Sequence, residues 1–355
     1  MKVVSVVGAR PQFVKLAPIA SAFARTDAEH VIVHTGQHYD PTLSDVFFSG
    51  LSIPSPDVHL AVGSGSHGHQ TAAMLSALED TFADVRPDWV LVYGDTNSTI
   101  AAALAAVKIH IPLAHLEAGL RSFNRLMPEE HNRVLTDHAA DLLLAPTDTA
   151  MRHLGNEGLA ARSVLVGDVM ADICLQLRRD IMAGNTSAKS TDVGEPYLVA
   201  TIHRAENTDD PARLAAIIAS IAEVDMAVHL FAHPRLRDRA ARHGIDLTSG
   251  SISLREPLPY RDMVAQILGS SGVITDSGGV QKESFLLERP CTTLRTETEW
   301  TETLEGGWNV LLPGLENLSA VATRTMSEPP GTSPFGDGHA ADAAVTALAT
   351  HTPSR

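Results

Sequence analysis

Residues 87–99 read PDWVLVYGDTNST, and no other stretch says more about the fold. The run from Trp89 to Tyr93 is apolar and rich in β-branched and aromatic residues, which is typical of a buried strand. Gly94 ends the run, and the alanine-rich residues 100–107 that follow have the composition of a helix. Asp95 comes directly after the strand. We therefore expect its carboxylate at the carboxyl edge of a parallel sheet, where α/β proteins hold their ligands.

The same order of strand, loop and helix repeats along the whole chain. Apolar runs of strand length alternate with amphipathic segments, which predicts mostly parallel, doubly wound sheets. The predicted strands are residues 3–7, 31–34, 90–93, 111–115, 142–145 and 164–166, and then residues 197–202, 228–232, 251–254, 272–275, 291–294 and 310–312.

This pattern stops between about residues 178 and 196, where glycine, asparagine, serine and threonine replace it. We therefore predict an α/β domain over residues 1–177, a linker over residues 178–196 and a second α/β domain over residues 197–339. A helix and tail are expected over residues 340–355. We expect the two domains to face each other across a cleft.

Composition excludes several classes of protein. The chain has 355 residues and a formal net charge of -15, from 27 basic and 42 acidic side chains, so it lacks the basic excess that binds nucleic acid. No apolar run approaches the roughly 20 residues that span a bilayer, and the first residues resemble a buried strand rather than a signal peptide. We expect a cytoplasmic protein without a membrane partner. Cys174 and Cys291 are far apart, which indicates neither a disulfide framework nor a thiolate metal site.

Two further carboxylates are expected beside Asp95. Glu117 comes just after the predicted strand at residues 111–115, and the loop that follows leads to Glu129 in the first turn of another helix. Because the carboxyl ends of parallel strands meet at one edge of a sheet, all three carboxylates can face one cleft. Clustered carboxylates of this kind are suited to general acid–base catalysis.

In the second half, residues 272–283 read GVITDSGGVQKE, a strand that breaks into a Ser-Gly-Gly turn and then starts a helix. The backbone N–H groups of such a turn and the helix dipole favour an anion, so Ser277, Gly278 and Gly279 are predicted to hold a phosphate or diphosphate. Glu283 lies where a carboxylate can accept hydrogen bonds from ribose hydroxyls. The alternative is an ordinary strand-to-helix turn with a solvated glutamate.

Cationic and histidine side chains supply the remaining candidates. The first strand is followed by GARPQFVK, with Arg10 and Lys15 where a dinucleotide fold carries glycines, so a nicotinamide dehydrogenase is disfavoured. Arg10 is either an anion clamp or a solvated helix-start arginine. His203 follows a predicted strand, next to Arg204, and is suited to protonate a leaving phosphate. The histidine spacings fit no zinc pattern, so we expect no catalytic metal and no cofactor.

Taken together, the motifs resemble those of the non-hydrolysing UDP-N-acetylglucosamine 2-epimerases. They occur in the family's order along essentially the whole chain: residues 8–15 (GARPQFVK), 94–99 (GDTNST), 115–121 (HLEAGLR), 128–133 (PEEHNR), 203–207 (HRAEN) and 275–279 (TDSGG). The resemblance implies two Rossmann-like domains of the GT-B type, a UDP-sugar substrate and a homodimer.

The resemblance also implies a mechanism. Such enzymes expel UDP by elimination across carbons 1 and 2 of the sugar, which gives 2-acetamidoglucal, and then add UDP back with a proton delivered to the opposite face. Asp95, Glu117, Glu129 and His203 are the implied catalytic residues. The implied ligands of the UDP-sugar are Arg10, Lys15, Arg133, Arg204, Ser277, Gly278, Gly279 and Glu283.

Departures from the common family pattern leave alternatives open. Ala9, Gln12 and Phe13 replace the residues of many members, and residues 296–300 lack the usual Arg-Pro. These variants resemble relatives that act on UDP-2,3-diacetamido-glucuronic acid. A hydrolysing epimerase shares the first half-reaction. A GT-B glycosyltransferase or a noncatalytic sugar-nucleotide sensor would need the phosphate turn but not the three carboxylates.

Overall fold

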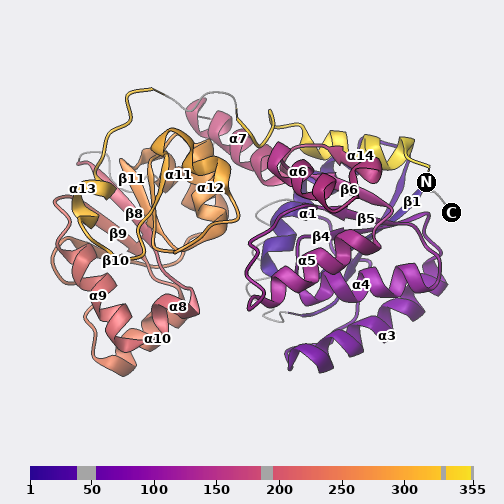
Figure 1. Ribbon diagram of the computed structural model, residues 1–355, viewed down its shortest axis with the longest axis horizontal. Coiled ribbons are helices and arrows are strands. Elements are labelled where there is room, and N and C mark those ends of the chain that lie inside the picture. The colour runs from indigo at the N-terminus through magenta and orange to yellow at the C-terminus, as the bar shows by residue number, and fades with distance from the viewer. Residues whose placement is uncertain (38–52, 185–194, 329–332, 353–355) are drawn as a thin grey trace. The chain divides into compact units, whose positions relative to one another are not determined.

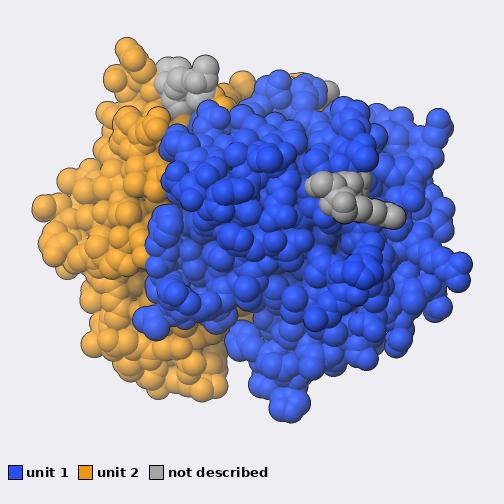
Figure 2. Space-filling model, turned by 45° about the vertical axis from the view of Figure 1, so that its right-hand side comes forward, with its two compact units in different colours: residues 1–173, 334–355 blue, residues 174–333 orange. Residues whose placement is uncertain are grey.

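The computed structural model describes residues 1–37, 53–184, 195–328 and 333–352. The chain divides into two compact units, which are coloured separately in Figure 2. Unit 1 comprises residues 1–173 and 334–355, and unit 2 comprises residues 174–333. In the described ranges, no helix is both long and apolar enough to cross a lipid bilayer.

Unit 1 is built on a parallel sheet with the strand order β3-β2-β1-β4-β5-β6-β7. The order places β1 and β4 side by side in the middle, as in a doubly wound sheet. The short strand β3 was not predicted, because two residues carry no periodic signal. The strands are β1 (Lys2–Val7), β2 (Glu29–His34), β3 (Val58–His59), β4 (Trp89–Tyr93), β5 (Leu113–Leu116), β6 (Leu142–Ala145) and β7 (Ser163–Leu165).

Helices cover both faces of this sheet (Figure 1). Alternate residues of β4 show the division: Leu91 and Tyr93 pack with α1 and α14, whereas Val90 and Val92 pack with α3 and α4. Both faces are apolar, which is why the strand has no polar alternation in its sequence. The described helices are α1 (Arg10–Phe23), α3 (His67–Val85), α4 (Asn97–Lys108), α5 (Pro128–Ala139), α6 (Asp148–Asn156), the 3-10 turn η1 (Ala160–Arg162), α7 (Val169–Met182) and α14 (Ala340–Thr350).

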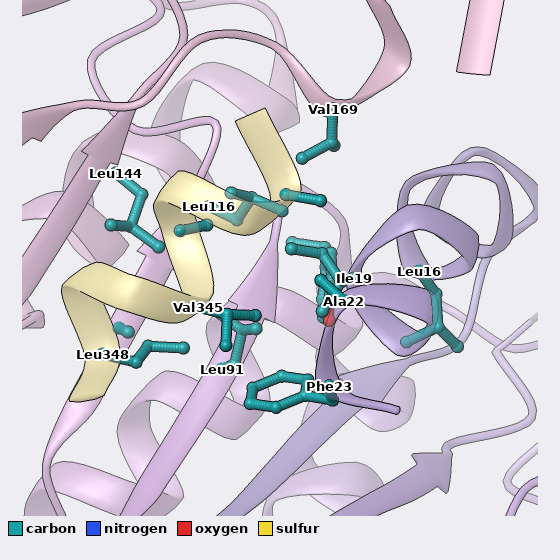
Figure 3. Packing of buried hydrophobic residues seen from close by; sticks show 14 of the residues in the cluster. Leu16, Ile19, Ala22, Phe23, Leu91, Leu116, Leu144, Val169, Val345 and Leu348 are labelled. Atoms are coloured by element: carbon teal, nitrogen blue, oxygen red, sulfur yellow. The ribbon is translucent and has the colours of Figure 1, made fainter. Parts of the chain in front are cut away.

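The C-terminal helix belongs to unit 1. In Figure 3, Val345 and Leu348 of α14 pack in one buried cluster with Ile19 and Phe23 of α1 and with Leu91 of the sheet. The carboxylate of Asp172, in α7, accepts hydrogen bonds from the first two amides of α14, at 2.9 and 2.8 Å. This capping satisfies helix-start N–H groups that otherwise have no partner. The chain therefore returns to its first unit at its end.

Unit 2 repeats the architecture with the order β10-β9-β8-β11-β12-β13, again parallel throughout. Its strands are β8 (Tyr197–Thr201), β9 (Ala227–Phe231), β10 (Ile252–Arg255), β11 (Gly272–Thr275), β12 (Cys291–Thr293) and β13 (Asn309–Leu311). Its helices are α8 (Ala205–Thr208), α9 (Pro211–Ala222), α10 (Pro234–His243), α11 (Tyr260–Gly269), α12 (Gly278–Leu286), the 3-10 segment η2 (Thr301–Gly307) and α13 (Leu318–Ala322).

The segment predicted as a linker is partly helical. Helix α7 starts in unit 1 and continues through residue 182, so the first residues of the predicted range 178–196 extend a helix. The amphipathic pattern ends with this helix, and residues 185–194 lie outside the described ranges.

Candidate active site

Each sheet has one switch point, where the chain connections that follow two neighbouring parallel strands run toward opposite edges of the sheet. In unit 1 these strands are β1 and β4, and in unit 2 they are β8 and β11. Doubly wound sheets bind ligands at the carboxyl ends of such a pair. Gly8 and Gly94 follow the two strands of unit 1, and Ile202 and Asp276 follow those of unit 2. The residues predicted to bind or react therefore lie at the expected edge of each unit.

At the unit 1 edge, Lys15 and Glu117 form an ion pair. Nζ of Lys15, from α1, donates to Oε2 of Glu117, and the two side chains are only 13% and 10% exposed. Burial alone would lower the pKa of Lys15, but the negative charges of Glu117 and Asp95 outweigh burial and raise it. Lys15 therefore keeps its charge and holds Glu117 in place.

The backbone around this pair is tightly constrained. Glu117 has a φ of +73°, in the left-handed region that residues other than glycine rarely adopt. Gly94 has a φ of +60°, and a Cβ on it would lie 3.1 Å from both Oε2 of Glu117 and Nζ of Lys15. Strained backbone of this kind persists where the surrounding structure fixes it, and it is frequent at active sites.

Asp95 is held by α5. Nε of Arg133 donates to Oδ2 of Asp95 at 3.1 Å and Nη2 makes a second, shorter bond, while Nη1 donates to Glu130 at 2.9 Å. Asn132 donates to the Asp95 carbonyl at 2.9 Å. Arg133, predicted to bind the substrate, is buried and contacts the carboxylates of Asp95 and Glu130.

A cavity of about 430 Å³ brings Asp95 together with Glu129, which is exposed in the first turn of α5. Most of the residues that form its walls are of polar types: Ala9, Gln37, Ser64, Gly65, His67, Gln70, Asp95, Thr96, Asn97, Pro128, Glu129 and Asn132. Glu117 is not among the residues that line this cavity.

Gln12 connects the two strand ends and was missed as a functional residue. Its Oε1 accepts the N–H groups of Gly8 and Ala9 at 2.8 and 2.9 Å, and its Nε2 donates to the Tyr93 carbonyl at 2.9 Å. A glutamate cannot make the last bond, because a carboxylate has no N–H. In the sequence, Gln12 could have been found from its position in the first turn of the predicted helix that follows the first strand. Arg10 is the first residue of α1, and its side chain lies outside the described part of the structure.

In unit 2, Ser277 caps α12, and its Oγ accepts the Val280 N–H at 3.4 Å. Gly278 and Gly279 start the helix as predicted, and Glu283 is buried at 5% exposure. The turn therefore presents a helix N-terminus, which favours an anion.

Two residues that the sequence did not single out lie against this turn. A Cβ on Gly278 would lie 3.6 Å from Nε1 of Trp300 and 3.8 Å from Oε2 of Glu299. Arg295 makes two hydrogen bonds to Glu299, at 2.9 and 3.1 Å. Burial alone would raise the pKa of Glu299, but Arg295 outweighs burial and lowers it to about 2. The negative charge beside the turn is therefore balanced.

His203 follows β8 and is anchored by Asp276. Nδ1 lies 3.1 Å from Oδ1 of Asp276, whose carboxylate also accepts the N–H groups of His203 and Arg204. Burial alone would raise the pKa of Asp276, but these hydrogen bonds and His203 lower it. A carboxylate on Nδ1 sets the tautomer and leaves Nε2 directed elsewhere. Asp276 is the main missed residue of unit 2; its signal was an aspartate directly after a buried strand.

His233, directly before α10, was also missed. Its ring centroid is 6.3 Å from that of His203, so two imidazoles lie at the same sheet edge. In the described ranges, no three histidine, cysteine, aspartate or glutamate side chains gather as metal ligands do. The expectation of no catalytic metal stays a prediction.

Residues 21–349 match the family model described as UDP-N-acetylglucosamine 2-epimerase. The chain belongs to the UDP-N-acetylglucosamine 2-epimerase family. The resemblance inferred from the six motifs is thus confirmed. Epimerases are isomerases, so the prediction of an isomerase is also confirmed.

Two relatives of this family show the extent of the similarity. The UDP-2,3-diacetamido-2,3-dideoxy-D-glucuronate 2-epimerase of Pseudomonas aeruginosa is 44% identical over 332 residues, 92% of each chain. The UDP-N-acetylglucosamine 2-epimerase of Methanocaldococcus jannaschii is 38% identical over 98% of this chain and 99% of its own. The crystal structure of the M. jannaschii enzyme with UDP-GlcNAc and UDP matches 99% of this chain and 100% of its own, with a TM-score of 0.90.

These similarities, with the two parallel sheets, confirm the predicted fold class of two Rossmann-like, GT-B-type domains. The roles predicted for individual side chains remain predictions.

Proposed function

We propose that this member of the 2-epimerase family interconverts UDP-N-acetylglucosamine and UDP-N-acetylmannosamine. The main supporting observation is the buried Lys15–Glu117 pair beside Asp95, at the switch point of the unit 1 sheet. Proton transfer at a carbon atom needs carboxylates fixed in position, and charged neighbours and strained backbone fix these two.

The proposed reaction has two halves. In the first, a base takes the proton from carbon 2, a double bond forms between carbons 1 and 2, and UDP leaves carbon 1 with the bonding electron pair. In the second, UDP adds back to carbon 1 and a proton is delivered to the opposite face of carbon 2. Opposite faces need separate proton donors and acceptors, which accounts for more than one carboxylate. Nothing is oxidised or reduced, so no cofactor is required.

We assign the proton transfers to Asp95, Glu117 and Glu129. Because Nδ1 of His203 is engaged by Asp276, Nε2 is the atom available to donate to the departing phosphate. A protonated imidazole in this position would stabilise the negative charge that develops on UDP.

We assign nucleotide binding to Arg10, Arg204, Ser277, Gly278, Gly279 and Glu283. Support comes from the N-terminus of α12, whose amides and dipole suit a diphosphate. For Lys15 and Arg133 the contacts support a different role from the predicted one, because they bind Glu117 and Asp95.

A second candidate substrate is UDP-2,3-diacetamido-glucuronic acid. The Pseudomonas relative that is named for this substrate is 44% identical, whereas the Methanocaldococcus relative named for UDP-N-acetylglucosamine is 38% identical. The elimination chemistry is the same for both sugars.

We also propose a homodimer in the cytoplasm. Both cysteines are buried free thiols, which suits a reducing compartment. Light scattering coupled to size-exclusion chromatography tests the dimer by giving the mass in solution.

Proton NMR in D2O tests the function. The enzyme is incubated in parallel with each UDP-sugar and no acceptor, and Glu117→Gln serves as the control that should bind UDP without exchange. Appearance of the carbon 2 epimer with deuterium at carbon 2 supports the proposal, and the substrate with the higher kcat/KM identifies the sugar. Release of free N-acetylmannosamine and UDP would instead identify a hydrolysing enzyme. No deuterium incorporation with either sugar would overturn the proposal and favour a glycosyltransferase.

A further inference from the structure

His115 lies within β5, two residues before Glu117, and is completely buried. Nε2 is 2.7 Å from the carbonyl oxygen of Gly94, and Nδ1 is 2.7 Å from Oδ1 of Asp137. A carbonyl oxygen only accepts hydrogen bonds, so Nε2 carries a proton. The charge of the ring then depends on whether Asp137 or Nδ1 carries the second proton.

The surroundings of Asp137 show that it is a carboxylate. Its other oxygen, Oδ2, accepts the N–H of Gly119 at 3.1 Å and Nη1 of Arg121 at 2.7 Å. Both groups only donate, and the Arg121 guanidinium is positively charged, so they favour the ionised form of Asp137 whatever the state of His115. An ionised carboxylate cannot donate, so Nδ1 of His115 must.

We propose that His115 donates from both ring nitrogens, to Gly94 and to Asp137, and that this doubly bonded ring is the positioning residue that fixes Asp95 and Glu117 for catalysis. The catalytic part of this inference rests on the proposed 2-epimerase function. The charge itself follows from the two acceptors on the ring.

The ion pair joins the segments that carry the proposed catalytic carboxylates. Through Nε2 it holds the carbonyl of Gly94, the residue before Asp95. Through the peptide chain and the Gly119 N–H it holds the turn that contains Glu117. Asp137 itself lies on α5, the helix whose first turn contains Glu129. One buried pair thus links the ends of β4 and β5 to α5.

A neutral imidazole at His115 could not hold both Gly94 and Asp137. With one N–H it can donate to either Gly94 or Asp137 but not to both, and the other acceptor would be buried without its bond. The strained turns at Gly94 and Glu117, with φ of +60° and +73°, are therefore expected to relax when the charge is lost.

Charged groups of both signs surround the His115–Asp137 pair. Arg121 makes two hydrogen bonds of 2.8 Å to Glu157, which also lies 3.0 Å from Nε2 of His138. Lys15, Asp95 and Glu117 lie on the other side, toward the sheet edge. The buried His115, Asp137 and Arg121, together with the half-buried Glu157, carry no net formal charge, which is how buried ions are tolerated.

The ring charge is measured first, on the wild-type protein without substrate. Histidine is labelled with 15N, and two-bond 1H–15N spectra are recorded from pH 6 to pH 9; the His115 signal is assigned by its loss in His115→Gln. We expect two protonated ring nitrogens in the folded protein, because both face acceptors. His30 is the internal comparison, because it is half-buried in the same sheet and burial lowers its pKa to about 4, so it should show a neutral ring. A neutral His115 ring would overturn the proposal.

The positioning role is measured next, with Asp137→Asn and His115→Gln. We expect kcat to fall about 10- to 100-fold, as it does when fixed groups shift by about 1 Å, with KM changed less than about 3-fold. His30→Gln is the matched control and should keep wild-type kcat. Asp137→Asn should also leave His115 with a single ring proton. Wild-type kcat in both variants, or an equal loss of UDP affinity, would overturn the positioning role.

The two proposals fail in distinguishable ways. If the wild-type enzyme epimerises neither sugar, the proposed function is wrong, but the ring spectra still test the charge. In that case the amide signals of Asp95 and Glu117 test the positioning. They should shift in Asp137→Asn and stay unchanged in His30→Gln, and unchanged signals in Asp137→Asn would overturn the inference.

Discussion

Replacing Gly119 by alanine should destabilise unit 1 far more than the same replacement at Gly158. Both glycines have left-handed backbones, with φ of +83° and +79°. A Cβ on Gly119 would lie 2.5 Å from the carbonyl oxygen of Ala150 and 2.9 Å from Cγ of Leu154, whereas a Cβ on Gly158 would have nothing within 4 Å. Comparing the two alanine variants therefore separates the cost of backbone strain from the cost of close packing.

The magnitudes follow from these contacts. A Cβ in the left-handed region costs roughly 1–2 kcal/mol, and reduced freedom of the unfolded chain offsets about 0.4–1 kcal/mol of this. Gly158→Ala should therefore lose about 1 kcal/mol or less. Gly119→Ala adds overpacking against a backbone carbonyl that cannot turn away, which costs roughly 1–3 kcal/mol more. We expect a total loss of about 2–4 kcal/mol for this variant.

Urea unfolding followed by circular dichroism gives the free energy of unfolding of both variants and of the wild type. Epimerase activity is measured on the same samples. Because Gly119 is two residues from Glu117, Gly119→Ala should also lose activity at urea concentrations where it is still folded. Equal free energies of unfolding for the two variants would refute the close approach of Gly119 to α6.

Three further outcomes are expected. Lys15→Gln leaves the Glu117 carboxylate without its buried partner, so kcat should fall at least about 10-fold, and a kcat within 2-fold of wild type would contradict the role of the pair. The pKa of Asp276 lies below its ordinary value of 3.8, so its stabilising effect is present above that value and is lost as the pH falls through the lower pKa of the folded state. Urea unfolding at pH 7 and pH 3 should therefore show a smaller acid-induced loss in Asp276→Asn than in the wild type. Asp172→Ala removes the cap of α14 and should cost about 1–2 kcal/mol, with faster hydrogen exchange confined to the first turn of α14; unchanged exchange there would show that the cap contributes nothing.

The strands were predictable because they are buried on both faces. The apolar run from Trp89 to Tyr93 has no polar alternation, and its parallel partners read the same way, so the existence of these strands and their parallel arrangement followed from the sequence alone. The positions of Asp95 and Ser277 after strands followed as well, whereas the order of the strands within each sheet was not predicted. Strand β3 was missed because two residues give no periodic signal.

Partners of the site residues were not predictable. Arg133 and Lys15 were expected to bind the ligand, because a sequence shows a cation but not the carboxylate that lies beside it in the fold. The role proposed for His115 could not be read from the sequence, because the two acceptors on its ring come from Gly94 and Asp137, 21 and 22 residues away. Long-range contacts of this kind depend on the packing of α5 against the sheet.

The return of α14 to unit 1 has a consequence for how the chain folds as it is synthesised. Unit 2 is one continuous segment and has been synthesised before residues 334–355, which complete unit 1. Until those residues are made, the nascent chain has no cover for Leu91, Leu116 and Leu144, which pack against this last helix. A premature stop codon only a few residues before α14 would therefore damage the unit that was made first.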